Sequence, residues 1–294
     1  MESMKQGFFV ENLRTFLEYE EKLPEDYEGM IPEKEITSIE FCNVSFSYKE
    51  ESRIINNLSF YIEGNSRVAL VGHNGAGKTT IIKLLFRLYD PDEGEILVNG
   101  INIKEYNLKA YRSLFAAAFQ DYKIFALSIR ENVLMRECSE EDDLQVVEAL
   151  TKAGVYDKIK TLPKGLDTTM TKEFDEEGTL LSGGEFQKIV VARAFVKNVP
   201  IKVFDEPSSA LDPIAEYELY DSIISDSIDK TMIFISHRLS SVRNADMVFM
   251  LENGTILERG THKELMELNG SYADMYNKQA KNYLAVENLQ EVIA

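Results

Sequence analysis

The chain has 294 residues, enough for one large domain or two modest ones. Its formal net charge of −18 argues against nucleic acid as the main partner, because binding a phosphate backbone requires a basic surface. The charge also argues against unaided adsorption to an anionic membrane. Two cysteines, Cys42 and Cys138, form no CxxC pair, which fits a reducing compartment such as the cytosol rather than a disulfide scaffold.

The first 35 residues differ from the rest and are interpreted as a linker or elbow segment. Phe9, Leu13, Phe16 and Leu17 recur at helical spacing, and an acidic stretch broken by proline and glycine follows. This helix either packs on the same domain or belongs with a neighbouring domain, and the pattern does not choose between the two. The apolar runs of the chain are too short to span a bilayer, and residues 1–35 contain no basic region followed by an apolar stretch, so no secretory signal is expected there.

From residue 36 onward, short β-rich runs alternate with helical patterns. The runs that predict strands are 39–41, 44–48, 58–62, 67–71, 201–204 and 232–235, and residues 81–88 have helical spacing. Compact apolar runs are typical of buried parallel strands, so the alternation predicts an α/β fold with a parallel core. The stretch 108–178 is interpreted as a mostly helical insertion, and residues 282–294 as a frayed helical tail.

A glycine-rich loop follows the strand predicted at 67–71. Its sequence is Gly72-His73-Asn74-Gly75-Ala76-Gly77-Lys78-Thr79-Thr80, which matches G-x-x-x-x-G-K-[ST] with a strand before it and a helix after it. Glycines let backbone N–H groups turn inward around phosphate oxygens, and the positive end of the helix strengthens that field. Lys78 supplies a charge for the β- and γ-phosphates, and the Thr79 hydroxyl suits Mg²⁺. The loop therefore predicts that the chain binds MgATP.

A second candidate site element lies where the strand predicted at 201–204 ends. Asp205 and Glu206 follow that strand directly, and strand ends are where ligands bind in open α/β sheets. Asp205 is expected to hold Mg²⁺ through water, and Glu206 to orient or deprotonate the attacking water. Alone, such a pair would be a solvated acidic turn, but the glycine loop makes it half of a hydrolytic site.

The sequence Leu181-Ser182-Gly183-Gly184-Glu185 opens a helical pattern, with Ser182 as the expected N-cap. In order and approximate spacing, these segments resemble the ATP-binding-cassette (ABC) ATPases over residues 36–281. The resemblance implies further roles. Tyr48 would stack on adenine, Gln120 would lie between the sheet core and the helical subdomain and help hold Mg²⁺, and His237 would contact the γ-phosphate. Residues 208–212 would form the loop that crosses to the partner subunit.

The resemblance also implies a P-loop NTPase core with a parallel sheet, an antiparallel β subdomain near the N-terminus and a helical subdomain at about 121–200. In this family the Ser-Gly-Gly helix of one subunit caps the ATP held by the other, so a second cassette is the expected partner. The resemblance implies three groups of site residues. The catalytic group is Glu206, His237, Gln120 and Lys78, and the Mg²⁺ group is Thr79, Gln120 and Asp205. The nucleotide-binding group is Tyr48, Gly72, Asn74, Gly75, Ala76, Gly77, Lys78, Thr79, Thr80, Gln120, Asp205, Ser182, Gly183, Gly184 and Glu185.

Two positions depart from the family pattern. Glu185 replaces the usual glutamine, which either complements the helix dipole by about 0.3–1 kcal/mol or weakens closure on the partner's γ-phosphate. Asn65 stands where many relatives have glycine, and asparagine tolerates the left-handed conformation of such a turn. Glu176 resembles the acidic residue that couples the site to the membrane domain.

Three functions compete for this motor. The segments 125–133, 162–168 and 261–265 resemble exporter-type transporters, and Thr261 with Glu264 has capping-box spacing. A soluble ATPase of DNA repair or translation usually carries long coiled-coil insertions or two cassettes in one chain. This sequence has neither, and its acidic charge argues against nucleic acid. A regulatory module with a dead site is disfavoured by intact Lys78 and Glu206.

The interpretation as an exporter predicts a motor at the cytoplasmic face of the cell membrane. It also requires a transmembrane domain, on a longer chain from which this sequence is excised or on a separate subunit. The sequence leaves the transported substrate open.

Overall fold

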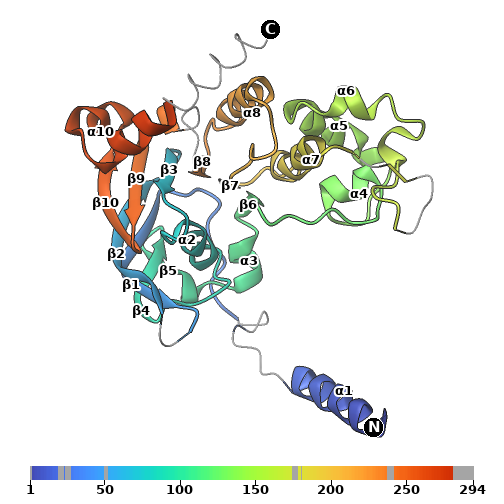
Figure 1. The fold of residues 1–294 in the computed structure, drawn as a ribbon, viewed down its shortest axis with the longest axis horizontal. Coiled ribbons are helices and arrows are strands. Elements are labelled where there is room, and N and C mark those ends of the chain that lie inside the picture. The colour runs from blue at the N-terminus through green and yellow to red at the C-terminus, as the bar shows by residue number, and fades with distance from the viewer. Residues whose placement is uncertain are drawn as a thin grey trace.

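The structure is a computed structural model that describes residues 2–18, 23, 28–49, 52–173, 178–179, 181–236 and 242–280. Two predicted functional residues, Glu176 and His237, lie outside the described residues, as does the predicted tail at 282–294. Two sheets form the centre of the molecule, and their strands are named in chain order below (Figure 1).

The smaller sheet has four antiparallel strands in the order β2-β1-β4-β5. Their bounds are β1 Ser38–Ser47, β2 Arg53–Glu63, β4 Glu93–Val98 and β5 Ile101–Asn102. Where the sequence predicted two strands, β1 is continuous, with a register shift between Phe41 and Val44. Asn43 lies there with φ 51°, the left-handed conformation expected of an extra residue in a bulge. Every second residue near the end of β2 is buried, so this sheet has one core face.

The larger sheet has six strands in the order β10-β9-β3-β8-β7-β6. Their bounds are β3 Arg67–Gly72, β6 Phe115–Ala118, β7 Ile201–Asp205, β8 Thr231–Ile235, β9 Met247–Glu252 and β10 Thr255–Gly260. All neighbours are parallel except β10 and β9. The parallel core was predicted, but β6 falls inside the stretch assigned to helices. Its alanines favour helix in isolation, and pairing with β7 overrides that preference.

Helices cover the larger sheet and form a separate group beyond β6. The helices near the strands are α2 Lys78–Leu85, α3 Leu108–Arg112, α8 Pro213–Ser225 and α10 His262–Leu268, with the short turn η1 Ile103–Glu105. The group beyond β6 contains α4 Ile129–Leu134, α5 Asp143–Lys152, α6 Tyr156–Ile159 and α7 Gly183–Phe195, with the turns η2 Glu140–Asp142 and η3 Gly165–Asp167. Figure 1 shows α4, α5 and α6 side by side at the edge of the molecule, with α7 leading back to the sheet.

Two large cores lie on opposite faces of the parallel sheet. One fills the space between the antiparallel sheet, α2 and side chains such as Val203 and Ile233. The other joins the opposite face, through Phe204 and Phe234, to α4, α5, α7 and α8. Since successive side chains of a strand point to opposite faces, β7 and β8 are buried on both sides.

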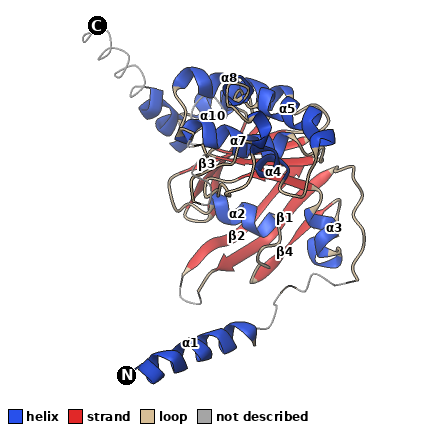
Figure 2. Ribbon diagram, turned by 90° about the vertical axis from the view of Figure 1, so that its right-hand side faces the viewer, coloured by secondary structure: helices blue, strands red, loops and turns tan. Residues whose placement is uncertain are grey.

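The N-terminal helix α1 (Glu2–Leu17) stands apart from both sheets (Figure 1, Figure 2). Leu13, Phe16 and Leu17 are 57, 77 and 73% exposed, so these apolar residues make little contact with the part of the chain that the structure describes. The structure does not show the stripe packed on either sheet, and a place beside a neighbouring domain stays a prediction. No helix among the described residues is long and apolar enough to cross a membrane.

Candidate functional site

The carboxyl ends of four parallel strands meet at one edge of the larger sheet. Gly72 ends β3, Asp205 ends β7, Ile235 ends β8, and Gln120 follows β6 by two residues. The strand registers place Leu70 beside Ile235 and Asp205 beside Ile235. Segments far apart in sequence therefore supply side chains to one edge, which is the usual ligand position in such sheets.

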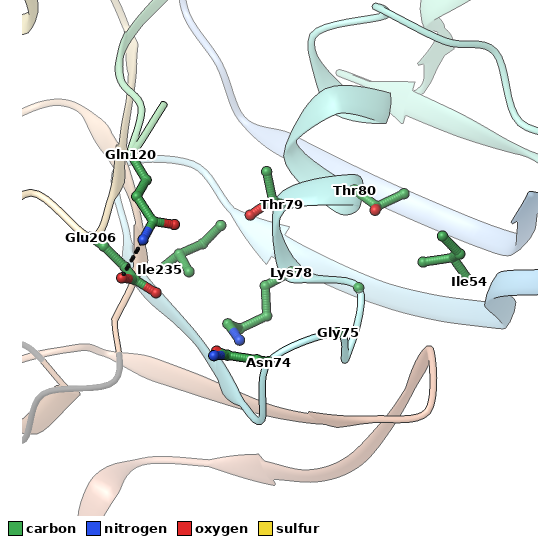
Figure 3. A pocket seen from close by; sticks show the side chains of 10 residues that line it. Ile54, Asn74, Gly75, Lys78, Thr79, Thr80, Gln120, Glu206 and Ile235 are labelled. Atoms are coloured by element: carbon green, nitrogen blue, oxygen red, sulfur yellow. Dashed lines mark hydrogen bonds between the residues drawn. The ribbon is translucent and has the colours of Figure 1, made fainter. Parts of the chain in front are cut away.

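A cavity of about 390 Å³ opens at this edge (Figure 3). Eight of the predicted site residues line it: Asn74, Gly75, Gly77, Lys78, Thr79, Thr80, Gln120 and Glu206. Lys78 and Asn74 project toward Glu206 from the glycine loop. Ile54 and Ile235 also line the cavity and were not predicted, since an isoleucine in a strand carries no local signal of a binding role.

The turn from the glycine loop into α2 depends on Gly77. This residue is the N-cap of α2 and has φ 101°, a conformation that residues with a Cβ rarely adopt. A Cβ at this position would lie 2.6 Å from Ile55 Cδ1. The first amide groups of a helix lack partners within it, and they carry the positive end of the helix dipole. Gly77 thus places an anion-binding helix end at the cavity.

Lys78 is held firmly although it is nearly buried, at 6% exposure. Its ammonium donates hydrogen bonds to the backbone oxygens of Gly72 (2.9 Å) and His73 (3.0 Å). Burial lowers the pKa of Lys78, while the carboxylates of Glu206 and Asp205 act in the opposite direction. The loop therefore fixes a cation at the place where phosphate charge would accumulate.

A hydrogen bond between the side chains of Thr79 and Asp205 joins the glycine loop to the end of β7. The Thr79 hydroxyl donates to Asp205 Oδ2 at 3.0 Å. Asp205 is 3% exposed, and burial raises its pKa to about 6, opposed by the Thr79 hydrogen bond. A buried carboxylate beside a hydroxyl is a donor set that suits a hard cation such as Mg²⁺.

Among the residues the structure describes, no cluster of three or more His, Cys, Asp or Glu side chains could hold a metal ion. Mg²⁺ in nucleotide sites typically takes one or two protein oxygens, with water and phosphate oxygens completing its shell. The pair formed by Thr79 and Asp205 fits that pattern, because it supplies two oxygens and leaves the other positions to ligands from outside the protein.

Glu206 adopts a left-handed backbone conformation with φ 51°. Such a conformation costs a non-glycine residue about 1–3 kcal/mol and persists where the surroundings determine it. The Glu206 N–H donates to the Ile235 oxygen at 2.9 Å, and Gln120 Nε2 donates to Glu206 Oε2 at 3.1 Å (Figure 3). These contacts turn the carboxylate out of the sheet and toward the glycine loop.

Ser182 caps helix α7, as predicted from the sequence. The Glu185 N–H donates to Ser182 Oγ at 3.3 Å, and the Ser182 N–H donates to Glu185 Oε2 at 2.7 Å, which forms a capping box. The carboxylate of Glu185 therefore contributes to its own helix, in accord with the first of its two interpretations. Ser182 and Gly183 are exposed and do not line the cavity of their own chain.

Tyr48 lies beside the cavity without lining it. Its hydroxyl is 3.3 Å from Thr80 Oγ1, its ring packs edge-on against Phe46 and Tyr89, and it is 41% exposed. The exposed part of the ring is available for a ligand that extends from the glycine loop. Ala76, also in the predicted nucleotide set, is buried.

The chain is similar in sequence to known proteins over most of its length. Residues 55–209 match the protein family described as ABC transporter. The chain is 38% identical over 239 residues to the ATP-dependent lipid A-core flippase of Alcanivorax borkumensis, covering 81% of this chain and 40% of the flippase. It is 40% identical over 253 residues to the mitochondrial iron-sulfur clusters transporter ATM1 of Saccharomyces cerevisiae, covering 85% of this chain and 36% of ATM1.

Two further comparisons cover nearly the whole sequence. The subtilin transport ATP-binding protein SpaT of Bacillus subtilis is 38% identical over 280 residues, which are 95% of this chain and 45% of SpaT. A solved structure, described as a bacterial Atm1-family ABC exporter with ATP bound, superposes with a TM-score of 0.84 at 33% identity. That superposition covers 95% of this chain and 48% of the exporter chain. The chain thus spans less than half the length of these relatives.

Proposed function

The chain belongs to the ABC transporter family, and on that premise we propose that it is the ATP-hydrolysing motor domain of an exporter-type transporter. The observation that carries the proposal is the convergence of Lys78, Thr79 and Glu206 on one cavity at the carboxyl edge of the parallel sheet. A phosphate-binding loop alone supports only nucleotide binding, whereas a carboxylate facing that loop supports hydrolysis.

In the proposed reaction, the amides of the glycine loop and the Lys78 ammonium bind the ATP phosphates. Thr79 and Asp205, with Gln120, would hold Mg²⁺, which neutralises phosphate charge when it is bound. Glu206 orients the attacking water and accepts its proton, and the Gln120 hydrogen bond sets the direction of the Glu206 carboxylate. Tyr48 is proposed to stack on adenine, and His237, outside the described residues, to contact the γ-phosphate.

We further propose that a second cassette completes each site. Ser182 and Gly183 stand exposed at the beginning of α7, outside the cavity of their own chain. An exposed helix N-terminus of this kind is suited to bind phosphate, and a second copy could present it to the bound ATP. ATP would then hold two chains together, and hydrolysis would remove those contacts.

Coupling to transport requires a transmembrane domain, which we place on a longer chain or on a separate subunit. The exposed apolar residues of α1 support a neighbouring domain at that end of the molecule. The motor would then work at the cytoplasmic face of a membrane. The relatives are named for a lipid A-core, iron-sulfur clusters and subtilin, and this variety supports an exporter role without selecting a substrate.

The test is the rate of phosphate release from MgATP by the purified chain over a range of protein concentrations. The rate per chain should rise with concentration and then level off, because each site needs a second copy. Glu206→Gln should lower the plateau rate by about 100-fold or more. Glu63→Gln, at the end of β2, makes the same chemical change at an exposed position and should leave the rate unchanged. A parent-like rate in Glu206→Gln would contradict the proposed role of Glu206.

A further inference from the structure

One buried polar side chain connects helix α7 to the loop that carries Glu206. Gln187 is 3% exposed and lies near the beginning of α7. Its Nε2 donates to the backbone oxygen of Glu206 at 2.9 Å and to Ser209 Oγ at 2.9 Å. Its Oε1 accepts a hydrogen bond from the Ala210 N–H at 2.8 Å. A single side chain therefore holds three groups of the segment 206–210.

The orientation of the Gln187 amide follows from its partners. A backbone N–H can only donate and a backbone oxygen can only accept, so the nitrogen must face Glu206 and the oxygen must face Ala210. Both donor hydrogens and the acceptor oxygen are used. A buried amide that lost these partners would be costly, so the arrangement holds the helix and the loop to each other.

The Glu206 peptide is the part of this loop that most needs external support. Its left-handed conformation is sparsely populated by non-glycine residues and is stable only where neighbours determine it. The Ile235 oxygen binds the N–H of Glu206, and Gln187 binds its backbone oxygen. With both backbone groups fixed, the carboxylate has a defined starting direction, which Gln120 completes.

Close packing at the start of α7 leaves the loop little room to move. A Cβ on Gly184 would lie 3.0 Å from Leu211 Cδ2 and 3.1 Å from the Ala210 oxygen. The same helix turn therefore contacts the loop through Gly184 and binds it through Gln187. Ser182, which we propose to complete the site of a second copy, is the N-cap of this first turn.

We propose that Gln187 is a positioning residue for ATP hydrolysis, which acts through Glu206 and rests on the hydrolytic function proposed above. It fixes the direction of the Glu206 carboxylate. It also ties that carboxylate to the end of α7 that would cap the nucleotide of the second copy. Movement of α7 on partner binding would thereby reach the water-activating group of the same chain through one side chain.

The test compares Gln187→Leu, which removes all three hydrogen bonds, with Gln187→Glu. The glutamate variant can still accept from the Ala210 N–H but cannot donate to the Glu206 oxygen. The matched control is Arg193→Met on the same helix, because the Arg193 guanidinium donates its hydrogen bonds to Asn132 of α4, at 2.7 Å to the backbone oxygen and 3.2 Å to Oδ1, rather than to the segment 206–210. Each chain is assayed for kcat and KM with MgATP, for thermal unfolding, and for hydrogen exchange of the Ala210 amide.

Both Gln187 variants should lower kcat by about tenfold or more, since a small misplacement of a reacting group is enough for such a loss. Their KM should stay within about threefold of the parent value, because the glycine loop is untouched. The Ala210 amide should exchange faster in Gln187→Leu and stay protected in Gln187→Glu. Arg193→Met should keep the parent kcat even where it lowers the melting temperature.

Two results would overturn this inference. One is a parent-like kcat in both Gln187 variants while Glu206→Gln is inactive, which leaves the hydrolytic function standing and removes the role of Gln187. The other is an equal loss of kcat in Arg193→Met, which reduces Gln187 to a contributor to folding. A parent-like rate in Glu206→Gln instead removes the role of Glu206 and with it the premise of this inference, whereas a parent chain that releases no phosphate from MgATP overturns the proposed function itself.

Discussion

A buried ion cluster beside β7, formed by Asp226 with Lys202, Lys230 and Lys152, gives a prediction that does not depend on ATP. Lys202, on β7, has a side chain 1% exposed, and its ammonium lies 2.7 Å from Asp226, which is 6% exposed. Lys230 and Lys152 approach the same carboxylate at 3.2 and 3.4 Å. One carboxylate therefore forms ion pairs with three ammonium groups. Replacing Asp226 by Asn should lower the free energy of unfolding much more than replacing Lys202 by Met.

The magnitudes follow from what each change leaves behind. Asp226→Asn leaves the Lys202 ammonium inside the protein without a counter-charge, and breaking a buried pair in this way costs about 3–5 kcal/mol of unfolding free energy. Lys202→Met removes the buried charge itself and puts an apolar chain near the Phe195 ring, which the ammonium approaches at 5.8 Å. Asp226 then keeps two lysines, so we expect a loss of only about 1–2 kcal/mol.

Urea unfolding at neutral pH measures both losses. Glu93→Gln is the control, because it breaks the exposed pair with Arg53 (2.7 Å) and should cost about 1 kcal/mol or less. A larger loss in Lys202→Met than in Asp226→Asn would refute the reasoning, since it would mean that the ammonium rather than the carboxylate holds the cluster together.

The same cluster predicts a dependence on pH. Burial acts to raise the pKa of Asp226, but Lys202 and Lys230 outweigh it and the net shift is downward. A carboxyl group with a depressed pKa in the folded state stabilises the protein above its unfolded pKa, about 3.9, and loses that contribution as the pH falls through the folded value. The stability difference between parent and Asp226→Asn should therefore shrink in acid.

Three further predictions concern the nucleotide site. Gly77→Ala should weaken ATP binding by about tenfold or more, measured by equilibrium dialysis, because a backbone with φ 101° is strained for a residue with a Cβ and Ile55 Cδ1 would have to move aside. Parent-like affinity would contradict this account of the loop. Asp205→Asn should raise the Mg²⁺ concentration for half-maximal hydrolysis by about tenfold or more, whereas an unchanged Mg²⁺ titration would remove Asp205 from the metal site. Glu185→Ala should lower stability by about 1 kcal/mol in urea unfolding, while Glu185→Gln should not, since either residue completes a capping box with Ser182.

Local patterns in the sequence predicted the parts of the fold whose signals are local. The glycine loop and the start of α2 follow from residue types at fixed spacing, as do the caps at Ser182 and Thr261. Asn65 likewise has the left-handed conformation expected of it, with φ 58°. In each case the residue and its partners lie within one or two turns, so spacing alone carries the geometry.

Features that depend on distant partners could not be predicted in this way. Strand β6 consists of one phenylalanine and three alanines, and only its pairing with β7 makes it a strand. Gln187 looks like an ordinary helix residue, because its partners lie some twenty residues further along the chain. Ile54 reaches the cavity only because β2 folds back beside the glycine loop.

The central claim is that ATP bound by one chain is enclosed by a second copy. Light scattering coupled to gel filtration tests it most directly on Glu206→Gln, in which bound ATP should persist. With MgATP this variant should elute at twice the mass of the monomer and carry one ATP per chain, and it should return to monomer when ATP is replaced by ADP. A Glu206→Gln chain that stays monomeric while saturated with MgATP would contradict the claim.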